Sequence, residues 1–386
     1  KPFTATGKPS ARCEDFRLEV RLEGLVEPDV SGEFCRIAVE LPDLGSRKQM
    51  IELLMQYGWK PTEYTDKGNP KFTEDSIVGK LGIQGQMLVE RFVCITRRSQ
   101  IGGWLEKVRP DGRIVAGAMP NATPTARMRH RTVVNVPRVG TPYGADLRAL
   151  FTVPVGKVQV GADASGLELR LLAHYMGDAA YTDAVVNGKS SDGTDVHTVN
   201  CKILGLEPKK VYILGGRETT GRDIAKTFIY ALLYGAGDEK LGSILDGGAK
   251  EGKKLRNKFL TGLPKYKILL EKVSKAATKG WLRGIDGRKI FIRHEHAALN
   301  SLLQSGGSIC VKMAMCRWAD VLIKKKVPFK LIGTFHDEVQ AECAPQHADI
   351  VGDEFCKAMT WVSDYLKMRV TLAGEYKVGS SWYDCH

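Results

Sequence analysis

One stretch of the sequence, residues 222–237, carries four reactive or polar side chains at the spacing of a helical face. Arg222, Lys226, Tyr230 and Tyr234 recur every fourth residue, so an α-helix would place them on one side. They span about 18 Å along a helix axis, the length of an extended nucleoside triphosphate with its base. Cations at the helix start suit phosphates, because free backbone N–H groups there also favour anions. Taken alone, the same pattern fits an amphipathic surface helix equally well.

Two aspartates stand at the ends of predicted strands. Asp163 closes the strand-like residues 157–163, just before a predicted helix, and Asp337 occupies a tight turn between strand-like segments 330–335 and 338–343. If the fold joins them, they could hold two Mg²⁺ ions for phosphoryl transfer, since Mg²⁺ takes few carboxylates plus waters and substrate phosphates. A lone turn aspartate is more often only a surface residue, and spacing does not exclude that reading.

The composition favours a polyanionic partner. Lys and Arg number 57 against 44 Asp and Glu, which gives a net charge of +13. Nucleic acid is the first candidate, because phosphate contacts dominate such binding. The cations are spread along the chain, no apolar run reaches the roughly 18 residues of a membrane span, and no signal peptide is evident. The nine cysteines form no CxxC or zinc pattern, so reduced thiols are expected, with Cys310 and Cys316 in the core.

The elements that must position these residues can be outlined from periodicity and caps. Ser46 is a predicted N-cap that opens a helical hairpin over residues 46–108. The Arg-rich segment 121–138 lies between two strand-like pieces, and residues 189–221 should connect helices around residues 196–204. The remaining predictions are strands at 16–22, 35–39, 113–119, 288–293 and 370–378, and helices at 167–176, 222–234, 297–324 and 346–367.

Three ordered motifs resemble motifs A, B and C of the family A DNA polymerases. They are DASGLELR at 163–170, RDIAKTFIYALLYG at 222–235 and HDEV at 336–339. The residues of motifs A and B and the continuation YGAGDEK at 234–240 are most similar to replicative polymerases of short-tailed phages, and the segment HAALNSLLQSGG at 296–307 is part of the family resemblance. The resemblance covers roughly residues 46–386. It implies an α+β right-hand polymerase core, with an antiparallel palm sheet and helical fingers and thumb.

The resemblance implies domain bounds and a first set of roles. An unassigned segment 1–45 would precede the thumb (46–110), and the palm (111–180 and 285–386) would be interrupted by the fingers (181–284). Asp163 and Asp337 match the metal-binding aspartates, with the backbone carbonyl of Ala164 as a further ligand to two Mg²⁺ ions. Lys226 matches a residue that grips the triphosphate and protonates the leaving pyrophosphate.

Further positions match nucleotide-binding and DNA-binding residues of the family. Arg222, Lys226 and His197 would lie at the nucleotide phosphates, and Tyr230 would stack on sugar and base. Glu168 would close the pocket under the sugar, contact Tyr234 and exclude a ribose 2′-OH. Arg127 stands in the family's Thr-Gly-Arg position, although Ala126 replaces the glycine. The other residues expected to contact DNA are Asn135, Asn300, Gln304, His336 and Glu338.

The implied activity is template-directed DNA synthesis, in which a primer 3′-OH attacks a dNTP and releases pyrophosphate. A single-subunit RNA polymerase, a non-catalytic DNA-binding module and a metal nuclease remain alternatives. No acidic motifs of a 3′–5′ exonuclease domain occur, so we expect no proofreading in this chain. The start at Lys1 suggests a fragment or processed product. Primer–template DNA and dNTP are the expected partners, with a thioredoxin-like processivity factor or a separate exonuclease or helicase chain as further ones. The expected setting is the cytoplasm of a phage-infected bacterium, with no membrane partner.

Overall fold

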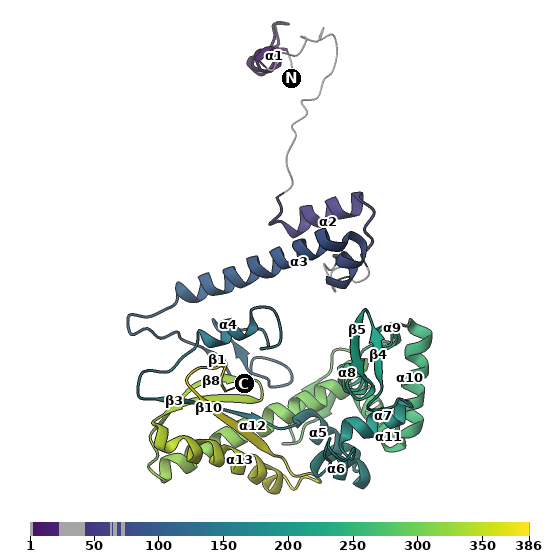
Figure 1. Cartoon of the computed structure of the whole chain (residues 1–386), viewed down its shortest axis with the longest axis vertical. Helices are drawn as coiled ribbons and strands as arrows, with labels where there is room; N and C mark the ends of the chain where they lie inside the picture. The colour runs from purple at the N-terminus through teal and green to yellow at the C-terminus, as the bar shows by residue number, and fades with distance from the viewer. Residues whose placement is uncertain (1–2, 23–42, 62–63, 65–67, 71–73, 386) are drawn as a thin grey trace. The chain divides into compact units, whose positions relative to one another are not determined.

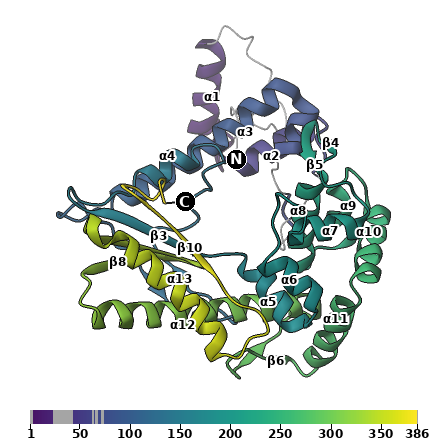
Figure 2. The same cartoon turned by 60° about the horizontal axis from the view of Figure 1, so that its bottom comes forward.

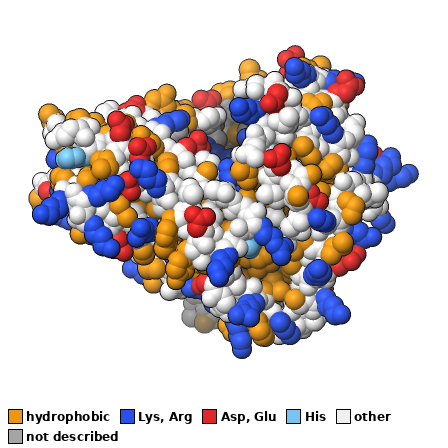
Figure 3. Space-filling view, turned by 90° about the horizontal axis from the view of Figure 1, so that it is seen from below, with side chains coloured by type: hydrophobic (Ala, Val, Ile, Leu, Met, Phe, Trp, Pro, Cys, Tyr) orange, Lys and Arg blue, Asp and Glu red, His pale blue; other side chains and the backbone are white. Residues whose placement is uncertain are grey.

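The computed structural model describes residues 3–22, 43–61, 64, 68–70 and 74–385 (Figure 1). The chain divides into two compact units, Lys1–Val89 and Glu90–His386, and the boundary falls inside helix α3 (Glu74–Leu105). Among the described residues, no helix combines the length and the hydrophobicity that crossing a membrane requires. On the face seen in Figure 3, Lys and Arg side chains are scattered over the surface, in keeping with the net charge of +13.

The first unit is helical where it is described. Helix α1 (Ala11–Leu22) covers residues 16–22, so the strand expected there is wrong. Its period-2 pattern is outweighed by helix-favouring residues and by Ser10, whose Oγ accepts a 3.3 Å hydrogen bond from Cys13 N. The strand predicted at 35–39 lies outside the described residues. Helix α2 (Arg47–Gln56) begins after Ser46, whose side chain accepts from Gln49 N as predicted.

The second unit is built on a four-stranded antiparallel sheet in the order β10–β3–β9–β8. The strands are β3 (Val158–Ala164), β8 (Phe329–Phe335), β9 (Glu338–Cys343) and β10 (Gly374–Gly379). Helices α12 (Ala298–Lys324) and α13 (Ala348–Tyr365) pack together on one side of it, where Trp318 Nε1 donates a 2.8 Å hydrogen bond to Val351 O (Figure 2). Because β3 and β9 are antiparallel neighbours, the last residues of β3 lie beside the first residues of β9.

A helical region is inserted between β3 and β8, and one hydrophobic core runs from the sheet into it. Its helices are α5 (Leu167–Met176), α6 (Ala179–Val186), α7 (Val196–Leu204), α8 (Gly221–Leu233), α9 (Asp238–Ser243), α10 (Ala249–Gly262) and α11 (Pro264–Ala277). The predicted helix at 167–176 is confirmed, and α7 lies within the helix-loop-helix connection expected around residues 196–204. The hairpin of β4 (Val211–Leu214) and β5 (Arg217–Thr220) was not expected, because only a Gly-Gly turn marks it. A second short hairpin, β6 (Trp281–Arg283) and β7 (Lys289–Phe291), leads back toward α12.

Three sequence expectations in this unit need correction. Of residues 113–119 only β1 (Ala118–Met119) is a strand, paired with β2 (Arg129–His130), because the preceding residues bond within the turn around Asp111. Strand β10 begins at Gly374, since Leu372 bonds instead to Ser363 and Thr360 on α13. Cys310 is buried as predicted, but Cys316 is exposed, because α12 turns one face to solvent. The short helix α4 (Gly144–Ala149) completes the region.

Candidate active site

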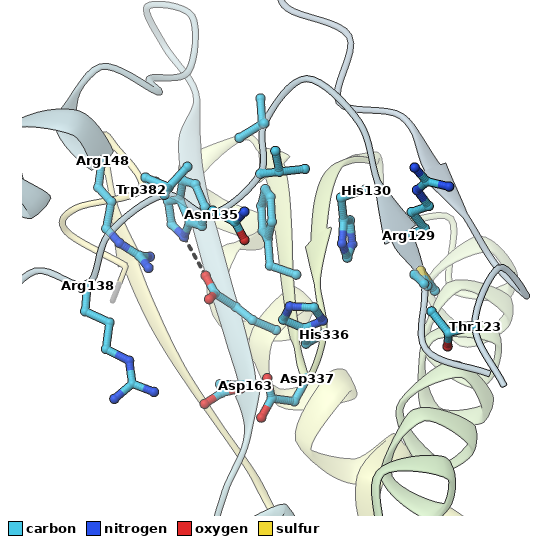
Figure 4. A pocket seen from close by; sticks show the side chains of 16 residues that line it. Thr123, Arg129, His130, Asn135, Arg138, Arg148, Asp163, His336, Asp337 and Trp382 are labelled. Atoms are coloured by element: carbon cyan, nitrogen blue, oxygen red, sulfur yellow. Dashed lines mark hydrogen bonds between the residues drawn. The ribbon is translucent and has the colours of Figure 1, made fainter. Parts of the chain in front are cut away.

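The fold brings Asp163 and Asp337 to one place. Asp163 is the second-last residue of β3, and Asp337 lies in the two-residue turn between β8 and β9, after His336 with its left-handed φ of 63°. Ala164 N donates a 3.2 Å hydrogen bond to Asp337 O, which ties the turn to the end of β3. Both side chains line a cleft of about 750 Å³, and Figure 4 shows their carboxylates beneath His336. Residues far apart in sequence thus share a site, as the resemblance implied.

The electrostatics of this pair favour a bound cation. Burial, followed by the charges of Asp337, Glu338 and Glu375, raises the pKa of Asp163 to about 7. Burial also raises the pKa of Asp337. Asp163 Oδ1 is buried and has no hydrogen-bond partner, which is costly for a carboxylate oxygen. A divalent cation would relieve the burial and the repulsion together, so this pair of carboxylates fits a metal site.

The number of protein ligands is small. Within the described parts of the chain, no group of three or more His, Cys, Asp or Glu side chains is arranged to hold a metal ion. Glu338 lies opposite Asp163 in the register of β3 and β9. Its side-chain Oε1, however, accepts a 2.6 Å hydrogen bond from Trp382 Nε1 and another from Gln340 Nε2. So sparse a set of ligands suits Mg²⁺, which keeps waters and substrate phosphates in its coordination shell.

Helix α8 has the two faces that the sequence predicted. Thr220 caps it by accepting a 3.2 Å hydrogen bond from Asp223 N, and Tyr234 is its last cap residue. The residues buried on its apolar face are Gly221, Ile224, Ala225, Phe228, Ile229, Leu232 and Leu233. The opposite side carries Arg222, half-buried Tyr230 and exposed Lys226. The buried face therefore fixes the direction in which the cations and phenols point.

Asp195 holds the first cation of this helix, which the sequence reading missed. Arg222 Nη2 and Nε donate to Asp195 Oδ1 at 2.8 and 3.1 Å. Asp195 also caps α7 through His197 N and accepts a 2.6 Å hydrogen bond from Thr198 Oγ1. Burial opposes its ionisation, but the hydrogen bonds from Arg222 and Thr198 lower the pKa of Asp195 to about 2. The only local signal was an aspartate at a helix start, which is usually just a cap.

His197 lies beside the cations of α8 and is neutral near pH 7. Burial, followed by the charges of Arg222 and Lys226, lowers the pKa of His197 to about 4. Its Nδ1 is buried without a hydrogen-bond partner, and its ring centroid is 6.1 Å from that of Tyr230. The structure thus gathers three predicted phosphate-binding residues at the start of α8.

The C-terminal end of α8 meets α5. Tyr234 Oη donates a 2.6 Å hydrogen bond to Glu168 Oε1, the contact that the resemblance implied. Burial, followed by the hydrogen bond to Glu168, raises the pKa of Tyr234 to about 12. Arg127 Nη2 lies 3.8 Å from the same Glu168 oxygen. Arg127 and Glu168 line a small cavity of about 30 Å³ together with Gln304, His336 and Asp337.

The wall of the larger cleft contains Asn135 and several residues that the sequence reading did not single out. Asn135 has a left-handed φ of 51° and lines the cleft, as do Arg129, His130, Arg138, Arg148 and Trp382 (Figure 4). The Arg148 guanidinium stacks 4.4 Å from the Trp382 ring centroid, and its Nε donates a 2.9 Å hydrogen bond to Pro137 O. The arginine density of residues 121–138 was the available signal for this basic wall. Asn300 lies one turn before Gln304 on α12 and lines neither cavity.

Comparison with known proteins agrees with this geometry. The sequence profile of DNA polymerase family A matches residues 28–384. The chain is 35% identical to the DNA-directed DNA polymerase of Escherichia phage T7, over 88% of this chain and 52% of the relative. It is 32% identical to that of Escherichia phage Phieco32, over 81% of this chain and 62% of the relative. The chain therefore spans about half to three fifths of the length of these relatives.

The fold comparison gives the same answer. The POL domain of Pol1 from M. smegmatis, solved in complex with DNA primer-template and dNTP, superposes with a TM-score of 0.76 at 22% identity. The match covers 89% of this chain and 61% of that one. A polymerase core fold is therefore supported, as predicted. With the profile match over most of its length, the chain belongs to DNA polymerase family A.

Proposed function

We propose that this chain is a template-directed DNA polymerase that extends a primer 3′-OH with dNTPs and releases pyrophosphate. The observation that carries the proposal is the pair of half-buried carboxylates, Asp163 and Asp337, at one cleft of a family A polymerase fold. Relatives named DNA-directed DNA polymerase support it. We further propose deoxynucleotides as substrates and primer–template DNA as partner, inside a phage-infected bacterial cell.

Family A polymerases use divalent metal ions, and we propose that two Mg²⁺ ions act here. Asp163, Asp337 and the backbone carbonyl of Ala164 would hold them. When bound, the ions would stabilise the attacking and leaving oxygens of an in-line displacement. Without the ions, the carboxylates of Asp163 and Asp337 repel each other, and this repulsion favours the binding of cations between them.

The start of α8 would bind the triphosphate. Arg222 and Lys226 supply charge-assisted hydrogen bonds, and neutral His197 adds an uncharged donor beside them. Asp195 must share Arg222 with the phosphates, because it holds that guanidinium through two donors. Lys226 would pass a proton from Nζ to the leaving pyrophosphate oxygen, as a general acid.

The middle and end of α8 would select the nucleoside. Tyr230 would stack on sugar and base, and Glu168, fixed by Tyr234, would occupy the space that a ribose 2′-OH needs. Arg127 and Gln304 border the cavity beside Asp337, so they would reach the primer terminus through groove acceptors shared by all base pairs. Asn135, Asn300 and His336 are proposed to add DNA contacts. Glu338 is buried and bonded to Trp382, so its contact with DNA stays a prediction.

Primer extension assays test the proposal directly. A labelled primer–template is incubated with the protein, Mg²⁺ and either dNTPs or rNTPs, with EDTA as the metal-free control. Metal-dependent extension with dNTPs supports a DNA polymerase. Preference for rNTPs would favour an RNA polymerase, and binding without incorporation would favour a DNA-binding module. The thumb, palm and fingers bounds, a thioredoxin-like factor and a separate exonuclease or helicase chain stay predictions.

A further inference from the structure

Helix α12 holds the loop that leads to Arg127. Lys312 Nζ donates to Pro120 O at 2.5 Å, to Asn121 Oδ1 at 3.3 Å and also to Ala126 O. Ser308, one turn earlier on the same helix, donates a 2.7 Å hydrogen bond from Oγ to Ala126 O. Both side chains therefore bind the carbonyl of Ala126. Lys312 also binds residues 120 and 121, so it contacts the loop at both of its ends.

Ala126, whose carbonyl accepts these hydrogen bonds, has an unfavourable backbone conformation. Ala126 has a φ of 58°, in the left-handed region that a Cβ disfavours, and it is 4% exposed. Such a conformation persists where the surroundings fix it. Here Ala126 N also donates a 2.9 Å hydrogen bond to Thr123 O, and Thr123 Oγ1 donates a 3.0 Å hydrogen bond to Arg127 O. The contacts from α12 thus hold the peptide directly before Arg127.

The conformation of Ala126 sets where the Arg127 side chain begins. That guanidinium reaches to 3.8 Å from Glu168 and borders the small cavity with Gln304 and Asp337. Gln304 lies two turns before Lys312 on α12. The same helix therefore positions the Gln304 amide directly and the Arg127 guanidinium through the loop. An ammonium has three donors, and those of Lys312 face three loop acceptors. Lys312 cannot bind a DNA phosphate without releasing the loop, so any effect on DNA should pass through Arg127.

We propose that Lys312, assisted by Ser308, is a positioning residue that presents Arg127 to the primer terminus. This inference rests on the proposed polymerase function and on the DNA contact of Arg127. It assigns to the middle of α12 a role in primer handling, in addition to the packing that its apolar residues supply.

A double-mutant cycle tests the assignment. Lys312→Met keeps the stem but removes the donors, and Lys324→Met is a matched control at the exposed end of the same helix. Each is combined with Arg127→Ala, and kcat/KM for primer–template is measured in steady-state extension. We expect Lys312→Met to lower kcat/KM about tenfold alone, as for a lost hydrogen-bond set of this kind. We expect less than about a twofold further loss in the Arg127→Ala background.

Each outcome decides something. Equal losses in both backgrounds, or no loss from Lys312→Met, would overturn the positioning role, because a general packing defect does not depend on Arg127. Lys324→Met should change neither background. If Lys312→Met does not fold, as judged by urea unfolding, Ser308→Ala takes its place and must show the same coupling at smaller amplitude. A wild-type protein that extends no primer would instead overturn the proposed function itself.

Discussion

The Tyr234 hydroxyl donates a 2.6 Å hydrogen bond to Glu168 Oε1, which joins the end of α8 to the first turn of α5. Helix α8 carries the stretch that resembles motif B, and α5 belongs to the stretch that resembles motif A. This bond therefore connects the helix that we propose to bind the nucleotide to the helix that directly follows the strand of Asp163. Arg127 lies near the same carboxylate. The Glu168 carboxylate is therefore held by α8 on the side where we propose that the nucleotide sugar lies.

The position of the Glu168 carboxylate predicts selectivity for deoxyribose over ribose. Glu168→Ala removes the carboxylate, so rNTP incorporation relative to dNTP incorporation should rise at least about tenfold. Tyr234→Phe keeps the ring and frees Glu168, so the same ratio should rise less. Competition assays with matched dNTP and rNTP measure both ratios. An unchanged ratio in Glu168→Ala would show that another group excludes the 2′-OH.

Tyr230 predicts the response to chain terminators. Its hydroxyl can supply a polar contact to a nucleotide that lacks the 3′-OH, and Tyr230→Phe removes only that hydroxyl. We expect discrimination against ddNTPs to rise at least about tenfold while dNTP incorporation changes little. Single-turnover incorporation of ddNTP and dNTP gives the two rates. Equal discrimination in both proteins would place the Tyr230 hydroxyl away from the sugar.

The pattern and the resemblance predicted much of this site, and the reasons are local. The four-residue repeat of α8 is visible in the sequence because its opposite face must be apolar. The β8–β9 hairpin is equally clear, since alternation flanks a two-residue turn. That Asp163 and Asp337 meet could be argued only from the order of the motifs, because no local pattern records a tertiary contact.

Other features could not be read from the sequence. Nothing local pairs Arg222 with Asp195, or Arg148 with Trp382, because these partners come from separate elements that the fold brings together. The strand expected at 16–22 is wrong because helix-favouring residues outweigh a period-2 alternation over so few residues. Lys312 donates hydrogen bonds to backbone carbonyls, and such contacts cannot be recognised from residue types because every residue has a carbonyl.

His197 predicts a pH dependence of stability. Its pKa is lowered from 6.5 to about 4 in the folded protein, so between these values the unfolded chain binds the extra proton. The free energy of unfolding should therefore fall as pH drops from about 6.5 to about 4, by about 3 kcal/mol from this group. His197→Gln should flatten that slope in urea unfolding, whereas the exposed control His294→Gln should not. A wild-type slope retained in His197→Gln would contradict the shift.

Asp163 predicts a linked effect of metal and charge. Its pKa is raised from 3.8 to about 7, so ionisation costs stability progressively as pH rises through that window. At pH 8 in EDTA, Asp163→Asn should raise the free energy of unfolding by about 1 to 3 kcal/mol. Added Mg²⁺ should raise the Tm of the wild type and not that of the variant. The exposed Asp320→Asn serves as control, and a destabilised Asp163→Asn would contradict the repulsion.

The central claim is that Asp337 and Asp163 form the reaction centre and that other residues bind the DNA. Asp337→Ala should abolish Mg²⁺-dependent primer extension, with a loss of at least about a thousandfold, while the Kd for primer–template stays within about threefold. Single-turnover extension and fluorescence anisotropy on the same preparation measure the two quantities. Lost extension with retained binding is the result we predict. Extension at the wild-type rate by Asp337→Ala would contradict the account.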